Sequence, residues 1–276
     1  YKIPYIIQPH GTLSAIDYHK KNKKKLFDFL LGKNIVKNAR CILALTKNEA
    51  NELQKSGIPK TKIHIFPNGI DLTSFNNLPP LGKFRRKYNL NINNKIILYL
   101  GRIHKIKGLD LLIDAYSKVI EEIPNVKLVI AGPDDGALRD LTTRVSKLGL
   151  QSQVLFIGPI FGEDKISAYV DCDVYVLPSI YETFPVSILE ACACGKPVIV
   201  TNSCGISTLI DKNNVGIVVP TREVCTLKNA IVKILTDENL RNIYATNARR
   251  FVKKFDWKIL INQLEEIYTK ILEEVL

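Results

Sequence analysis

The sequence contains no methionine, a single tryptophan, and no apolar run near the roughly 20 residues that a membrane-spanning helix needs. These residues therefore predict no helix that crosses a membrane. Residues 1–4 lead almost directly into an apolar strand, and together with the missing methionine this start leads us to expect a chain that begins inside a longer protein. The cysteines have neither the spacing of a metal site nor that of a disulfide framework, which predicts small buried thiols in a reducing compartment. They are Cys41, Cys172, Cys192, Cys194, Cys204 and Cys225.

Acidic residues are in the minority, because 27 Asp and Glu face 39 Lys and Arg, and the net charge is +12. Lysines cluster between Lys20 and Lys25. The cluster fits either a solvated helix face or a surface that docks on an anionic membrane, where each basic residue contributes about 1 kcal/mol. Nucleic acid is not expected as a partner, because no recognised binding module accompanies the charge.

From residue 95 onward, short apolar runs alternate with stretches of helical periodicity. Near-continuous apolar strands separated by helices indicate a parallel sheet covered on both faces. The fold class is therefore α/β, with a complete Rossmann-like domain over residues 95–255. The predicted strands are 96–100, 126–130, 154–157, 174–177, 198–200 and 217–219, and the predicted helices are 108–122, 136–148, 163–170, 185–194 and 205–211.

Residues 1–71 predict a second, partial Rossmann-like domain. Apolar runs at 5–7, 41–45 and 62–66 indicate strands, too few for a whole domain. Thr46 and Glu49 have the spacing of a capping box at a helix start. Residues 72–94, rich in Asn, Pro and Gly, are interpreted as a linker. Residues 256–276 form a last predicted helix with one apolar stripe, made of Trp257, Leu260, Leu264, Ile267, Ile271 and Val275.

Two glutamates flank the start of a predicted helix. Glu182 follows the strand at 174–177, and Glu190 lies more than a turn inside the helix that begins near Pro185. Both are expected at the carboxyl edge of the sheet, where open α/β sheets bind ligands. Two acceptors and the free amides of a helix start suit a polyhydroxylated, anionic ligand.

Four stretches of the sequence resemble the motifs of one enzyme family. They are the segment from Glu182 to Glu190, the run Gly101-Arg102-Ile103-His104-Lys105-Ile106-Lys107-Gly108, the turn Pro67-Asn68-Gly69-Ile70-Asp71 and the turn Pro9-His10-Gly11. Together they resemble the family 4 retaining glycosyltransferases, also called glycosyl transferases group 1. The resemblance implies the GT-B architecture of two Rossmann-like domains, here with a complete C-terminal and a partial N-terminal one. It also implies that the last helix crosses back to the N-terminal domain.

The resemblance implies roles for individual residues. Arg102 and Lys107 would bind the diphosphate of a nucleotide-sugar donor, which gains negative charge as it leaves. Glu182 would contact the transferred sugar, Glu190 the ribose hydroxyls, and His10 the donor sugar or the acceptor. Further donor-binding residues would be Thr183, Phe184, Gly158, Pro159, Ile160 and Gly132. No metal or other cofactor is expected, because the two bases and a helix start supply the positive charge.

Plainer interpretations stay open for these residues. Arg102 and Lys107 fit surface bases, Glu190 fits the exposed face of a helix, and His10 fits a structural histidine. Glu182 as a covalent nucleophile is a minority alternative.

Two further segments bear on the resemblance. Asp171-Cys172-Asp173 matches the D-x-D of metal-dependent glycosyltransferases, but it precedes a strand, at the wrong end of the sheet for the crevice. We interpret it as a helix end and strand entry. Thr208 stands where the family usually has an acid, so no donor contact is carried over to that loop.

We expect a retaining, metal-independent glycosyltransferase. It would move a sugar from a UDP- or GDP-linked donor to a saccharide or lipid-linked acceptor in surface polysaccharide or glycan biosynthesis. The expected location is cytoplasmic and peripheral on the inner face of the cell membrane. Two alternatives are a nucleotide-sugar 2-epimerase of GT-B shape, for which the sequence offers no proton-abstracting set, and a non-catalytic nucleotide-sugar-binding fragment.

Overall fold

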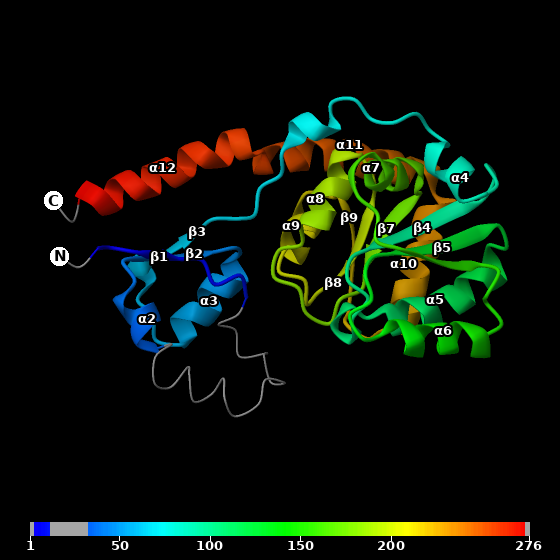
Figure 1. Ribbon diagram of the computed structural model, residues 1–276, viewed down its shortest axis with the longest axis horizontal. Helices are drawn as coiled ribbons and strands as arrows, with labels where there is room; N and C mark the ends of the chain where they lie inside the picture. The colour runs from blue at the N-terminus through cyan, green and yellow to red at the C-terminus, as the bar shows by residue number, and fades with distance from the viewer. Residues whose placement is uncertain (1–2, 12–32, 274–276) are drawn as a thin grey trace. The chain divides into compact units, whose positions relative to one another are not determined.

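The computed structural model describes residues 3–11 and 33–273 and divides the chain into two compact units (Figure 1). Unit 1 comprises Tyr1–Gly69 and Trp257–Leu276, and unit 2 comprises Ile70–Asp256. The lysine cluster at 20–25 lies outside the described residues. Among the described helices, none combines the length and the apolar character that crossing a membrane requires.

Unit 1 contains a three-stranded parallel sheet in the order β1-β2-β3. The strands are β1 (Ile6–Ile7), β2 (Cys41–Ala44) and β3 (Ile63–Ile65). The helices α2 (Lys33–Asn38) and α3 (Lys47–Lys55) connect them, and α12 (Trp257–Glu273) returns to this unit from the end of the chain. Every described strand pair is parallel because a helical or irregular crossover separates successive strands.

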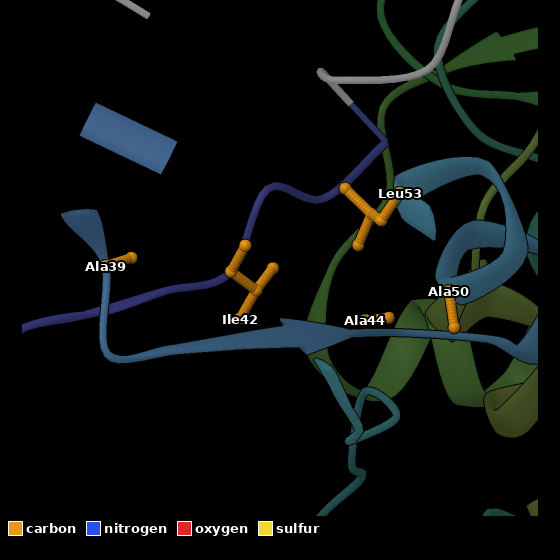
Figure 2. Packing of buried hydrophobic residues seen from close by; sticks show 5 residues of the cluster. All are labelled: Ala39, Ile42, Ala44, Ala50 and Leu53. Atoms are coloured by element: carbon orange, nitrogen blue, oxygen red, sulfur yellow. The ribbon is translucent and has the colours of Figure 1, made fainter. Parts of the chain in front are cut away.

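Alternate residues of β2 supply the two cores of unit 1. One core contains Ile42 and Ala44 with Ala39, Ala50 and Leu53, and Figure 2 shows these side chains spread along one side of β2. The opposite face carries Cys41, Leu43, Phe66 and Leu260, against which Leu264, Ile267 and Ile271 of α12 also pack. The period of two along β2 therefore buries both faces of this strand. Of the predicted apolar stripe, Leu260, Leu264, Ile267 and Ile271 belong to this core. The ring of Trp257 lies 6.5 Å from that of Phe66, and Val275 lies outside the described residues.

Unit 2 contains a six-stranded parallel sheet in the order β6-β5-β4-β7-β8-β9. The strands are β4 (Lys95–Leu100), β5 (Val126–Ala131), β6 (Val154–Gly158), β7 (Val174–Leu177), β8 (Val198–Thr201) and β9 (Gly216–Val219). The chain builds one half of the sheet outward from β4 and then returns to build the other half from β7. The order is that of a doubly wound sheet whose switch point lies between β4 and β7.

Helices cover both faces of this sheet. On one face, α5 (Leu109–Glu122) packs against α6 (Leu138–Lys147) and α10 (Val224–Thr236). On the other, α7 (Gly162–Asp171), α8 (Val186–Ala193) and α11 (Glu238–Val252) pack in sequence, and α9 (Ser207–Lys212) precedes β9. Figure 1 shows the two layers above and below the strands of this unit. The inner strands β4, β5, β7 and β8 are buried along most of their length, as parallel strands between helix layers are, whereas the edge strands β6 and β9 are partly exposed.

Residues 72–94, interpreted from the sequence as a linker, belong to unit 2. They contain a short 3₁₀ helix at Leu72–Phe75 and the helix α4 (Lys83–Lys87), which packs on α7. The N-cap of α4 is Gly82, which has no side chain to cap the free amides. The carboxylate of Asp171 does so from α7, accepting from the amides of Gly82 at 2.6 Å and Arg85 at 3.0 Å.

The guanidinium of Arg85 completes this attachment. It is buried and donates to the carbonyl oxygens of Asn91, Asn94 and Asp171 at 2.7–3.0 Å. Asp173 accepts from the amide of Ile96 at 2.8 Å, at the start of β4. The two acids of the D-x-D sequence therefore bind backbone and arginine, at the helix end and strand entry where we expected them.

We predict that Asp171→Ala destabilises unit 2 by about 2–4 kcal/mol, because it leaves the backbone amides of Gly82 and Arg85 at the start of α4 without their carboxylate acceptor. Hydrogen exchange of the peptides covering residues 82–95 measures the loss. Asp164→Ala is the matched control on the same helix, because Asp164 pairs with Lys87 at the surface, where ion pairs contribute little. Equal protection of the two variants would contradict the prediction.

Candidate functional site

The carboxyl edge of the unit 2 sheet gathers most of the predicted site residues. Arg102 and Lys107 follow β4, and Gly132 follows β5. Gly158 ends β6, and Glu182 lies in the loop after β7. Because all six strands are parallel, these residues share the edge at which a doubly wound sheet binds ligands, on both sides of the switch point.

The loop that carries Glu182 is fixed by hydrogen bonds to its two neighbours. The amide of Ile180 donates to the carbonyl oxygen of Ile106 at 2.8 Å, in the short 3₁₀ helix Lys105–Lys107. On the other side, the amide of Gly205 donates to the carbonyl oxygen of Glu182 at 2.7 Å. This loop therefore has a defined backbone before any ligand binds.

The side chains of Glu182 and Lys107 form an ion pair. Both are largely withdrawn from solvent, with 18% and 14% of their side chains exposed. Attraction between opposite charges is stronger where water is excluded, so this pair is stronger than a surface pair. Two residues predicted to act on the donor are thus in direct contact, and each neutralises the other.

Glu190 has a different set of partners. Its Oε1 lies 2.5 Å from the Nζ of Lys165, and its Oε2 accepts from the hydroxyl of Tyr169 at 3.0 Å. Lys165 and Tyr169 are four residues apart on α7 and therefore share one face of that helix. Burial, with the nearby Tyr175 and Glu190 as smaller causes, raises the pKa of Tyr169 well above its ordinary value. The Tyr169 hydroxyl therefore stays a proton donor.

Arg102 is the most exposed charged residue of the set. Its guanidinium lies 2.6 Å from a carboxylate oxygen of Asp135, and 63% of its side chain is exposed. The backbone beneath it is fixed, because the buried hydroxyl of Tyr99 donates to the carbonyl oxygen of Arg102 at 2.8 Å. Arg102 thus combines a fixed position with a side chain that can move to a ligand.

Glycines allow the loops at this edge to approach closely. Gly132 has φ 147°, and a Cβ there would lie 1.8 Å from the carbonyl oxygen of Gly101. Its amide also donates to the carbonyl oxygen of Gly158 at 2.8 Å. Gly108 has φ 67°, and a Cβ there would lie 2.2 Å from the carbonyl oxygen of Pro178. Only residues without a Cβ fit these two positions.

His10 belongs to unit 1, in the turn after β1, where it is exposed and has φ 50°. The buried carboxylate of Glu49 fixes the turn, because it accepts from the amides of Gly11 and Leu45 at 2.6 Å each. The expected capping box is half formed: Thr46 accepts from the amide of Glu49 at 3.1 Å, whereas Glu49 binds those two other amides. The role of His10 stays a prediction.

The remaining predicted donor residues differ in exposure. Thr183 is half-buried, and Phe184 is buried with its ring 5.5 Å from that of Phe255. Pro159 is exposed and Ile160 is buried. The side chain of Phe184 therefore belongs to the core of unit 2, and its predicted contact with the donor stays a prediction.

Sequence reasoning missed the partners of Glu190 and the buried tyrosines. Tyr99, Tyr169 and Tyr175 are fully buried, and each donates a hydrogen bond close to the site. Within strands and helices they had the pattern of ordinary core residues. The sequence did contain one indication of their role. A tyrosine in an otherwise apolar strand or helix is expected to be buried, and its hydroxyl then needs a polar partner.

The described residues contain no cluster of three or more His, Cys, Asp or Glu side chains that could hold a metal ion. His104 is therefore not part of such a cluster among the described residues. Its Nδ1 accepts from the amide of Ile106 at 3.1 Å and so caps the 3₁₀ helix.

We predict that Gly132→Ala lowers the melting temperature by several degrees and weakens ligand binding at this edge, because its Cβ would displace Gly101 and with it Arg102. Gly136→Ala is the matched control. Gly136 lies in the same loop with φ 86°, but a Cβ there would meet nothing within 4 Å. Equal melting temperatures for the two variants would show that the close approach at Gly132 carries no special constraint.

Family profiles and individual relatives both identify the chain as similar to glycosyltransferases. The profile described as "Glycosyl transferases group 1" matches residues 82–251, and the one described as "Glycosyltransferase Family 4" matches residues 1–74. An uncharacterized glycosyltransferase of Methanocaldococcus jannaschii is 34% identical over 76% of this chain and 54% of its own length. A D-inositol 3-phosphate glycosyltransferase of Corynebacterium jeikeium is 26% identical over 98% of this chain and 68% of its own length.

Solved structures show the same fold. Sucrose-phosphate synthase of Thermosynechococcus elongatus has a TM-score of 0.82 at 25% identity, over 99% of this chain and 69% of its own. Anabaena HepE, in complex with UDP and glucose, has a TM-score of 0.86 at 23% identity, over 97% of this chain and 72% of its own. The predicted α/β class and GT-B architecture are thereby confirmed.

The chain spans between about half and two thirds of the length of the curated relatives described above. The profile at residues 82–251 covers all the strands of the unit 2 sheet and most of the surrounding helices. Because that match spans more than half of the chain, the chain belongs to the glycosyl transferases group 1 family.

Proposed function

We propose that this chain supplies the donor site of a retaining glycosyltransferase that uses a UDP- or GDP-linked sugar without a metal. The observation that carries the proposal is that both motif glutamates pair with lysines, Glu182 with Lys107 and Glu190 with Lys165, in the unit whose strand β4 leads into Arg102. Carboxylates suit sugar and ribose hydroxyls, and the cationic groups suit a diphosphate. HepE, a protein of the same fold, binds UDP and UDP-glucose.

The diphosphate would be bound by Arg102 and Lys107. Arg102 offers a planar fork to two phosphate oxygens. To bind them it would have to give up its ion pair with Asp135, which is exposed and therefore weak. Lys107 would exchange the carboxylate of Glu182 for a phosphate oxygen. The helix α5 adds the positive end of its dipole, because its N-cap is Gly108 and no side chain caps its first amides.

The exchange would release Glu182 for the sugar. A carboxylate freed from its lysine has both oxygens available for vicinal hydroxyls of the transferred sugar. The departing phosphate would take the proton of the acceptor hydroxyl, so the reaction would need no enzyme nucleophile. The backbone of Gly158, Pro159 and Ile160 would line the base, with Gly132 beside it, and the amides of Thr183 and Phe184 would help to hold the sugar and phosphates.

The wider role is also a proposal. The acceptor would be a saccharide or a lipid-linked glycan used in surface polysaccharide biosynthesis, with the protein cytoplasmic and at the inner face of the membrane. His10 would orient the donor sugar or the acceptor. Because the chain covers little more than half of some relatives, binding without transfer is a specific alternative for these residues alone.

A binding panel tests the proposal. UDP, GDP, UDP-glucose and GDP-mannose are titrated into wild type and into Arg102→Ala and Lys107→Ala, with affinity measured by calorimetry. We expect one nucleotide series to bind wild type, and each substitution to weaken it about tenfold or more, the equivalent of one lost charge-assisted contact. Lys87→Ala removes a surface lysine that pairs with Asp164 and is the control. If neither series binds wild type, the proposal is wrong.

A second prediction follows from the ion pair. Glu182→Gln should tighten the binding of the sugar-free nucleoside diphosphate by about 3- to 10-fold, because Lys107 no longer has to leave a carboxylate. The same variant should lose transfer activity in a chain that has it. Glu163→Gln, which breaks the surface pair with Lys83, is the control and should leave the affinity unchanged. Weaker binding by Glu182→Gln would contradict the proposed exchange.

A further inference from the structure

Both carboxylate oxygens of Glu190 already have one partner each. Lys165 Nζ lies 2.5 Å from Oε1, and the Tyr169 hydroxyl donates to Oε2 at 3.0 Å. The side chain of Glu190 is 14% exposed, and that of Lys165 is 28% exposed. The group is thus largely buried, and two contacts from α7 set its orientation.

Tyr169 is itself held in place. Its ring lies edge-on to that of Tyr175, with the centroids 5.6 Å apart, and both residues are fully buried. The hydroxyl of Tyr175 lies 2.8 Å from Ser187 Oγ and donates to the carbonyl oxygen of Leu100 at 3.0 Å. Leu100 ends β4, two residues before Arg102. The network therefore connects Glu190 to the strand end that carries the phosphate-binding arginine.

A carboxylate offers about four acceptor positions, two on each oxygen. Lys165 and Tyr169 occupy one position on each, which leaves one on each oxygen for a ligand. Two acceptor positions on adjacent oxygens match the two hydroxyls of a vicinal diol. A carboxylate free to rotate would lose part of this match, because its orientation would have to be fixed on binding.

We infer that Lys165 and Tyr169 are positioning residues that hold Glu190 for the vicinal diol of a nucleotide ribose, and that they set a preference for ribonucleotides over 2′-deoxyribonucleotides. The inference rests on the proposed function. Beyond the proposed function, it assigns a role to Lys165 and Tyr169, which lie outside the family motifs. It also predicts one measurable property, the ratio of the affinity for a ribonucleotide to that for its 2′-deoxy form. Lys165 supplies the opposite charge that pairs with the carboxylate, and Tyr169 donates a hydrogen bond to it.

The test compares UDP with dUDP, and GDP with dGDP, by calorimetry on the full chain. Wild type should bind the ribonucleotide of its series more tightly than the deoxy form. Tyr169→Phe should weaken the ribonucleotide about fivefold and the deoxy form, which keeps only the 3′-hydroxyl, by less, so that the ratio moves toward one. Lys165→Met should move the ratio in the same direction.

Matched controls separate positioning from stability. Tyr116→Phe also removes a buried tyrosine hydroxyl, one that lies 2.9 Å from the carbonyl oxygen of Val126, away from the strand ends of the site. Lys87→Met removes a paired lysine at the surface. Neither control should change the ratio, even where Tyr116→Phe lowers the melting temperature.

Each outcome has one meaning. If Tyr169→Phe and Lys165→Met keep the wild-type ratio, or weaken both nucleotides equally, the two residues only support the fold and the inference is wrong. If wild type binds a ribonucleotide without preferring it to its deoxy form, the inference also fails while the proposed function stands. If wild type binds neither UDP nor GDP, the proposed function itself fails.

Discussion

The need to neutralise partly buried carboxylates organises this site. Glu182 and Glu190 lie in a part of unit 2 where few atoms reach solvent, and an unpaired charge there would cost several kcal/mol. Each is therefore matched by a lysine from a different element, Lys107 after β4 and Lys165 on α7. One pair joins the loop after β7 to the segment after β4, and the other joins α8 to α7. The same charges that make the edge stable without a ligand are those suited to a diphosphate and to hydroxyls.

Much of the fold could be predicted from local patterns. The strands of unit 2 agree with the predicted ranges to within one residue at each end, because buried parallel strands are short apolar runs bounded by polar turns. Residues 72–94 were interpreted as a linker because their composition is that of a loop, and the structure places them in unit 2. What attaches them is Asp171, more than 80 residues further along the chain, and no local pattern indicates such a contact. The helices α10 and α11 were given no predicted ranges, because no motif or strand alternation marked them.

The motif residues of the site could be predicted from the sequence, but the residues that hold them in place could not. Glu182, Lys107 and Glu190 could be named because family motifs and strand ends coincide. Their partners could not, because Lys165 and Tyr169 appear in the sequence only as one face of an ordinary helix. Glu49 shows the same limit in unit 1, where a residue expected to cap its own helix instead fixes the turn at His10. Which backbone amide a carboxylate meets depends on how strands pair, which a local pattern does not contain.

The two ion pairs differ in how readily they can change partner. Glu190 is held by Lys165 and by a tyrosine packed among buried rings, so a ligand must bind to it as it stands. Lys107 ends the short 3₁₀ helix Lys105–Lys107. Among the described residues, its side chain forms a hydrogen bond with Glu182 alone. A diphosphate, which carries more charge than one carboxylate, competes well for that lysine. Under the proposed function, Glu190 would recognise a part of the donor that does not change during the reaction, and Glu182 would act after the diphosphate has bound to Lys107.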